Sequence, residues 1–90
     1  MGYIRKEDNM KTINEAVVER LLFLMNERNL TQYKLAQESG VPFATIKSIM
    51  QRRTKNITLK TIIMLADGLK ISPAEFLEDK TFQVENLKID

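Results

Sequence analysis

Apolar residues recur at every third or fourth position over most of the chain, a spacing typical of helices with one buried face. Ile13, Val17 and Leu21 begin the first such series. They follow a capping box, Thr12 with Glu15, in which a hydroxyl and a carboxylate each accept a hydrogen bond from a backbone N–H group at a helix start. The pattern predicts a first helix from this cap to about residue 28.

Two shorter helices follow, separated by a tight turn. Thr31 caps a helix predicted over residues 32–39. It stops at Gly40, because a residue without Cβ adopts the left-handed conformation easily. Pro42 begins the next helix, predicted over residues 42–50, since its fixed φ suits a first helical turn.

Further caps mark the last two helices. After a loop, Thr58 caps a fourth helix that ends at Gly68. Ser72 and Glu75 form a second predicted capping box, with Pro73 at the first position of a short fifth helix. The predicted fold class is therefore all-α, a compact bundle of five helices.

The five helices define one domain, predicted over residues 12–79. Residues 1–11 are predicted to be a flexible N-terminal arm, and residues 80–90 a flexible C-terminal tail. The tail is also a possible dimer contact, because it carries apolar residues that could dock on the domain or pair with a second chain: Phe82, Val84, Leu87 and Ile89.

Composition excludes several classes of function. The 90 residues include no Cys, His or Trp, so there is no disulfide, thiolate or imidazole metal ligand, or Ser-His base. We therefore expect no cofactor and no enzymatic activity. The longest apolar runs, residues 21–25 and 62–66, are too short to cross a membrane. Residues 1–6 lack a signal-peptide apolar stretch, so we expect a cytoplasmic protein without membrane contact.

The charge is unevenly placed although the net charge is only +2. Residues 31–60 contain six Lys or Arg and one acid, Glu38, which gives +5, whereas residues 1–30 sum to 0 and residues 61–90 to −3. Such a dipolar arrangement favours docking of one face on a polyanion, with a merely solvated basic surface as the alternative.

Residues 32–51 meet the requirements of two short helices that cross steeply at a turn. Ala36 is small where the two backbones approach, and Gly40 tolerates a positive φ in the turn. The wedge between these helices and the rest of the core needs apolar residues, and the sequence supplies them: Leu35, Val41, Ile46 and Ile49.

These residues, within the segment LTQYKLAQESGVPFATIKSI, resemble the phage-repressor-like (Xre-type) helix-turn-helix family. The resemblance covers about residues 12–77 and includes KNITL and ADGLKIS further along the chain. It implies a five-helix bundle of the lambda-repressor-like type that binds operator DNA as a dimer. Members of this family often carry Gly at the position of Arg52 and Pro at that of Ile57.

The resemblance places the third helix in the major groove, with its N-terminal residues facing base edges. Lys47 can donate to guanine, Ser48 to several bases, and Ala44 or Phe43 can contact a thymine methyl group. For Phe43 an alternative stays open, namely packing on Tyr33 or Met50. The predicted base contacts are Phe43, Ala44, Lys47 and Ser48.

A second set is predicted to contact phosphates. In the family a Gln at the position of Gln32 holds a phosphate at the start of the second helix, where backbone N–H groups add partial positive charge. Tyr33 and Thr45 either reach a phosphate or only cover the core edge. The full set is Gln32, Tyr33, Thr45, Gln51, Arg52, Arg53, Lys55 and Asn56.

The sequence thus predicts a sequence-specific DNA-binding transcription regulator, a repressor that inserts residues 42–50 into the major groove. Its expected partner is double-stranded DNA with a palindromic operator, bound by a homodimer. The alternative is a protein-binding helical module, antitoxin-like or an adaptor, with secondary DNA binding. An enzyme is disfavoured because no base-bearing constellation or phosphate-binding loop is present.

Overall fold

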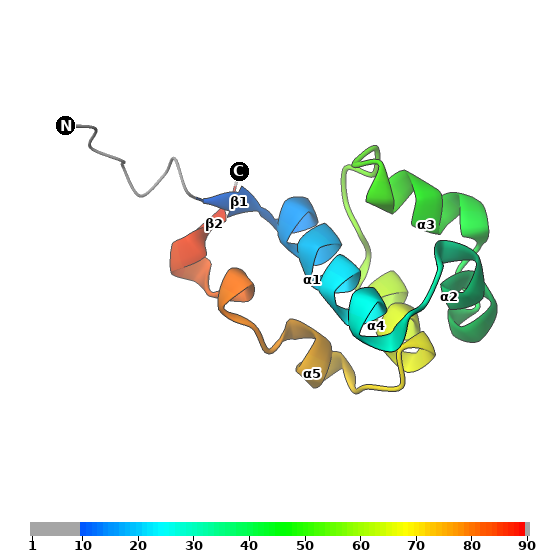
Figure 1. The fold of residues 1–90 in the computed structure, drawn as a ribbon. Coiled ribbons are helices and arrows are strands. Elements are labelled where there is room, and N and C mark those ends of the chain that lie inside the picture. The colour runs from blue at the N-terminus through cyan, green and yellow to red at the C-terminus, as the bar shows by residue number, and fades with distance from the viewer. Residues whose placement is uncertain (1–9, 90) are drawn as a thin grey trace.

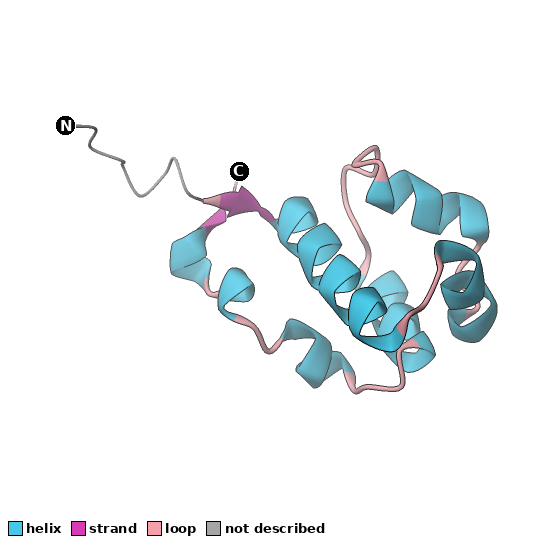
Figure 2. Cartoon of the chain, in the orientation of Figure 1, coloured by secondary structure: helices cyan, strands magenta, loops and turns pink. Residues whose placement is uncertain are grey.

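The computed structural model describes residues 10–89, and within them the predicted all-α fold is confirmed (Figure 1). The sole strands in this range are two residues long each and lie where the described chain begins and ends (Figure 2). The elements in chain order are β1 (Lys11–Thr12), α1 (Ile13–Arg28), α2 (Gln32–Ser39), α3 (Phe43–Met50), α4 (Leu59–Gly68), α5 (Pro73–Leu77), the 3-10 turns η2 (Lys80–Phe82) and η3 (Val84–Asn86), and β2 (Leu87–Lys88).

The predicted caps form the helix starts. At α1 both halves of the capping box are present: the backbone N–H of Glu15 donates to Thr12 Oγ1 at 3.1 Å, and the backbone N–H of Thr12 donates to Glu15 Oε1 at 2.9 Å. The bond from the Thr12 backbone N–H stabilises the Glu15 carboxylate and, together with the Thr12 side chain, holds the pKa of Glu15 below its ordinary value. At α5 one half is seen, a bond from the Glu75 N–H to Ser72 Oγ at 3.0 Å.

The turn between α2 and α3 has the expected geometry with one difference. Gly40 has φ +78°, the left-handed conformation predicted for it. Pro42 is the cap before α3 rather than its first residue: its ψ of 140° is extended, and its carbonyl accepts hydrogen bonds from Thr45 and Ile46. Helix α3 therefore starts at Phe43, one residue later than predicted.

Gly68 ends α4 as predicted, but a tight turn is not the reason for a glycine there. A Cβ atom on Gly68 would lie 2.6 Å from Ser39 Cβ and 2.8 Å from Ser39 Cα. The absent side chain lets α4 approach the end of α2. The left-handed residue after α4 is Lys70, with φ +64°.

One core joins the five helices. Leu35 of α2, Ile46 of α3 and Leu65 of α4 have no exposed surface, and Leu21 of α1 and Phe76 of α5 are equally buried. Each follows the apolar periodicity of its helix. None of the helices among residues 10–89 is long and apolar enough to cross a membrane.

Residues 80–89 are folded, unlike the flexible tail predicted over residues 80–90. β2 runs parallel to β1, with Lys11 opposite Leu87. Leu87 is buried, and Phe82 lies against Phe76 with ring centroids 6.4 Å apart. Phe82 and Leu87 thus pack on their own chain, whereas Val84 and Ile89 stay exposed. Of the predicted N-terminal arm, residues 1–9 lie outside the described range, and Lys11 belongs to β1.

Candidate nucleic-acid interface

Helices α2 and α3 form a helix-turn-helix whose inner side is apolar. Leu35, Val41, Ile46 and Ile49 are all at most 3% exposed, as the sequence predicted for the wedge between the two helices. Since these residues fix which side of α3 faces the core, the opposite side faces solvent. Figure 1 shows both helices at the end of the molecule away from β1 and β2.

The outer side of α3 presents several predicted DNA-contacting residues together. A shallow surface hollow of about 270 Å³ is lined by Ala44, Lys47, Ser48, Gln51 and Arg53. Lys47 is exposed and Ser48 is partly buried. Three predicted base contacts and two predicted phosphate contacts therefore share one surface, which we call the reading hollow.

Phe43, the fourth predicted base contact, packs beside the reading hollow on an aromatic neighbour. Its ring centroid lies 6.2 Å from that of Tyr33, with the planes tilted by 49°. Phe43 nevertheless keeps 47% of its surface exposed, and Tyr33 keeps 57%. The two alternatives left open for Phe43 are therefore compatible, because packing on Tyr33 covers only part of the ring.

The chain leaves α3 through a Schellman motif, in which the last carbonyl groups of a helix accept two reverse-turn hydrogen bonds. The N–H of Arg52 donates to the Ile49 carbonyl at 3.0 Å, and that of Arg53 to the Ser48 carbonyl at 2.9 Å. Arg52 has φ +59°, the conformation that glycine adopts without strain. The motif is compatible with the Gly that the resemblance to the family implies at this position, and the Arg53 that follows it lines the reading hollow.

The loop that follows is held by α1, through a contact that the sequence did not predict. Asn14 Nδ2 donates to the carbonyl of Thr54 at 2.7 Å and also contacts that of Lys55. No local sequence signal marks this bond, because its partners lie forty residues apart in the chain.

Lys55 and Asn56, two further predicted phosphate contacts, do not line the reading hollow. They line a second depression, of about 390 Å³, beside the start of α1 and the β2 strand. Lys88 lines the same depression and brings a further positive charge to it, which the sequence analysis missed. Of the predicted phosphate contacts after α3, Gln51 and Arg53 thus line the reading hollow, Lys55 and Asn56 line this second depression, and Arg52 lines neither.

The remaining predicted phosphate contacts are on α2 and α3. Gln32 is the first residue of α2 and is partly buried, as is Thr45 in the first turn of α3. Thr31 caps α2 by accepting a hydrogen bond from the Lys34 N–H at 3.1 Å.

The basic segment keeps most of its charge unpaired. Lys34 forms an exposed ion pair with Glu38 at 3.7 Å. Within residues 10–89 no ion pair involves the other five basic residues of this segment: Lys47, Arg52, Arg53, Lys55 and Lys60. Their charges are available to a polyanion.

Comparison with known proteins agrees with this geometry. The family model of the Cro/C1-type HTH DNA-binding domain matches residues 20–81, and the chain belongs to this family. It is therefore a DNA-binding transcription regulator of the phage-repressor-like helix-turn-helix class, as its sequence predicted.

The chain is also similar to two individual proteins. The chain is 37% identical to the Control protein C.SmaI of Serratia marcescens over 65 residues, which are 72% of this chain and 76% of that protein. It also resembles the crystal structure of the prophage Lp1 protein 11, with a TM-score of 0.73 and 31% identity over 82% of this chain and 97% of that one.

Proposed function

We propose that this protein is a sequence-specific repressor that binds a palindromic operator as a homodimer. The observation that carries the proposal is the reading hollow, where Ala44, Lys47 and Ser48 share one exposed surface with Gln51 and Arg53. Inserted into the major groove, Lys47 donates to guanine O6 or N7 and Ser48 donates to a neighbouring base. Arg53 binds the adjacent phosphate and sets the register of the helix on the duplex.

Further phosphate contacts flank this surface. Gln32 and the first backbone N–H groups of α2 bind one phosphate, because a helix N-terminus carries partial positive charge. Tyr33, Thr45 and Arg52 add further phosphate contacts, and Lys55 with Asn56 extends the contact beside the start of α1. With roughly three to four phosphates neutralised per subunit, log K of a dimer falls with log[salt] at a slope of about −5 to −7.

The homodimer is proposed from the symmetry of operators bound by helix-turn-helix proteins, whose half-sites lie about 34 Å apart. Phe82 and Leu87 pack on their own chain, so they are not free for a dimer contact. Leu77 of α5, Val84 and Ile89 stay exposed, at 40%, 71% and 61%, and are the residues that we assign to it.

The proposal is tested by selecting bound sequences from a random DNA pool and measuring their affinity by fluorescence polarisation. We expect a palindromic consensus, and we expect Lys47→Ala to relax sequence preference with an affinity loss of about 1–3 kcal/mol. Arg53→Ala is expected to weaken all DNAs similarly and to make the salt slope about one unit shallower per subunit. Lys80→Ala, which removes an equal charge outside the reading hollow, is the matched control.

Unchanged binding of every DNA by Lys47→Ala and Arg53→Ala would refute the proposed surface. A stable protein partner, together with weak DNA binding that does not depend on salt, would instead favour the protein-binding module.

A further inference from the structure

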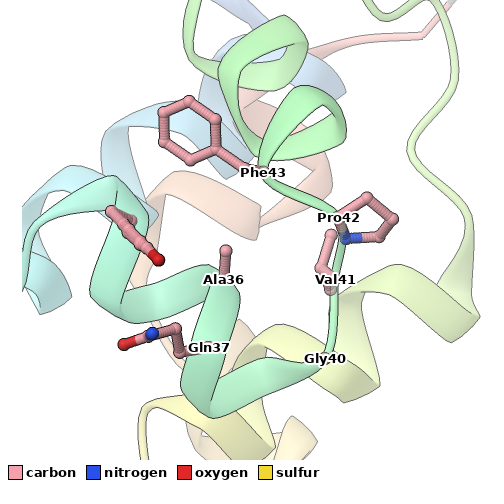
Figure 3. Close-up of a pocket in the computed structure, with 7 residues that line it drawn as sticks. Ala36, Gln37, Gly40, Val41, Pro42 and Phe43 are labelled. Atoms are coloured by element: carbon pink, nitrogen blue, oxygen red, sulfur yellow. The ribbon is translucent and has the colours of Figure 1, made fainter.

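Two further depressions lie near the reading hollow, and they differ in charge. The larger, of about 580 Å³ between α2 and α3, is lined by uncharged residues, and Figure 3 shows Ala36 pointing from α2 toward the start of α3. The other, of about 390 Å³, is lined by Lys55, Asn56 and Lys88 and, among the described residues, by no acidic one. We call it the basic depression. Of the two, it is the one whose charge is complementary to the phosphate backbone of DNA.

We propose that Lys88, in the short strand β2, binds a phosphate of the DNA backbone beside the operator half-site. The inference rests on the proposed function, and it extends the DNA contact beyond the helix-turn-helix to a strand that follows the last helix. Lys88 lies outside residues 20–81, which the family model matches, so nothing in that match assigns this role to it.

The basic depression is within reach of the DNA that α3 binds in the proposed complex. Arg53 lines the reading hollow, and Lys55, two positions later, lines the basic depression. Two residues of chain span at most about 7 Å, and successive phosphates of one strand are spaced by about 3.4 Å along the helix axis. The phosphates next to the one bound by Arg53 are therefore within reach of the basic depression.

Two long-range contacts place Lys88 beside the loop after α3. Backbone pairing of β2 with β1 sets Lys88 opposite Thr12, and the buried Leu87 anchors the strand on the domain. Asn14 holds the loop, because its Nδ2 donates to the Thr54 carbonyl at 2.7 Å. Both edges of the basic depression are thus fixed to the start of α1, so Lys88 binds a phosphate with little further loss of backbone freedom.

The charge of Lys88 is available to a phosphate. Its side chain is exposed, and within residues 10–89 neither Lys88 nor Lys55 forms an ion pair. The acidic group nearby is that of Glu15, whose pKa is lowered first by its hydrogen bonds with Thr12 and then by the charges of Arg52 and Lys88. Three positive charges therefore outnumber this one negative charge around the start of α1.

Removal of the Lys88 charge tests the contact through the salt dependence of operator binding, measured by fluorescence polarisation. One neutralised phosphate contributes about 0.9 to the slope of log K against log[salt], so Lys88→Ala is expected to make the slope shallower by about 0.9 per subunit. As salt falls from about 200 to about 50 mM, the ratio of the affinities of the unchanged protein and this variant should rise about 3.5-fold per subunit.

Three further variants are the controls for this measurement. Lys88→Gln is a second uncharged variant, closer to lysine in size, and is expected to behave as Lys88→Ala does. Lys88→Arg keeps the charge and is expected to keep the slope. Lys80→Ala removes the charge of an exposed lysine in η2 that does not line the basic depression, and it is also expected to keep the slope. Circular dichroism confirms that each variant is folded.

A neutral phosphate analogue locates the contact on the DNA. Single methylphosphonate linkages, which carry no charge, replace each phosphate in turn on both flanks of the selected operator. We expect one position in each half-site at which the replacement weakens binding of the unchanged protein but not of Lys88→Ala, because the two partners of one contact are not independent. The selected consensus is expected to be the same for both proteins, because a backbone contact carries no sequence information.

An unchanged salt slope in Lys88→Ala, or an equal change in Lys80→Ala, overturns the contact and leaves the proposed function standing as long as the operator is bound. Equal responses of the unchanged protein and Lys88→Ala at every methylphosphonate position also overturn it, because the lysine then acts only as part of the overall charge. Failure of the unchanged protein to select any DNA contradicts the proposed function, and this inference with it.

Discussion

Replacing Gly68 by alanine tests how closely α2 and α4 must approach to hold the helix-turn-helix in place. In an ordinary helix interior this change stabilises a protein, because alanine is favoured over glycine by about 1 kcal/mol. Here the added Cβ atom meets Ser39 Cβ at 2.6 Å, Ser39 Cα at 2.8 Å and Ser39 N at 2.9 Å. Two of these three atoms belong to the backbone of α2, so no side-chain rotation relieves the contact.

The balance of the two effects gives the expected size. Inserting a methyl group into a closely packed contact costs about 1–3 kcal/mol, and a contact with backbone atoms belongs at the upper end. After the propensity gain of about 1 kcal/mol is subtracted, Gly68→Ala is expected to lower the free energy of unfolding by about 2 kcal/mol. For a domain of this size the melting temperature falls by about 8–16 °C.

Urea unfolding followed by circular dichroism measures this change. Lys60→Ala, an exposed substitution on the same helix, is the matched control and should stay within about 0.5 kcal/mol of the unchanged protein. Adding Ser39→Gly to Gly68→Ala removes the 2.6 Å contact and is expected to recover part of the loss relative to Ser39→Gly alone. An alanine variant at least as stable as the unchanged protein would refute the close approach of α2 and α4.

Two further predictions concern a helix end and a helix start. Arg52 adopts φ +59°, a conformation that costs a non-glycine residue about 1–2 kcal/mol. Arg52→Gly is therefore expected to be about 1 kcal/mol more stable than Arg52→Ala in urea unfolding. The comparison isolates the backbone effect, because both variants lose the same charge. Equal stabilities would contradict this. Hydrogen bonds from Thr12 hold the pKa of Glu15 below 4.5, so its stabilising contribution is present above that pH and is lost as the pH falls through the lowered pKa. The free energy of unfolding of Glu15→Gln should therefore fall less than that of the unchanged protein when the pH is lowered from about 6 to about 3. If the free energies of the two proteins fall in parallel over this range, the effect is excluded.

The helices could be predicted from the sequence because their signals are local. Thr12, Thr31 and Thr58 each cap the helix that follows within three residues of themselves, and each bond is present in the structure. The turn at Gly40 is equally local, since its φ depends on one missing Cβ atom. Together these signals determine where α2 ends and α3 begins, and therefore which side of α3 faces solvent.

The β1–β2 pair could not be predicted because its cause is not local. Lys11 pairs with Leu87, 76 positions further along the chain, and strands of two residues show no alternation of apolar and polar residues. The hydrogen bond from Asn14 to the loop after α3 could not be predicted for the same reason, because its two partners lie far apart in the sequence. The apolar character of Leu87 indicated that the segment had a partner, but not that the partner was its own domain.

Gly68 illustrates a residue whose place at a helix end could be predicted from the sequence, whereas its structural role could not. A glycine at a helix end usually relieves a positive φ, but the residue with positive φ after α4 is Lys70. Only the packing of α4 on Ser39 shows what the missing side chain provides.

Phe43 shows why the candidate site needed the structure. From the sequence, base contact and packing on Tyr33 were alternative roles for the Phe43 side chain, because we treated each role as excluding the other. An aromatic ring has two faces and an edge, so contact with Tyr33 at 6.2 Å still leaves about half of Phe43 in water. Packing fixes where the ring stands, and the uncovered part can then contact a base with little further loss of side-chain freedom. In the proposed complex with DNA, the contact that serves the fold also positions Phe43 at the first turn of α3.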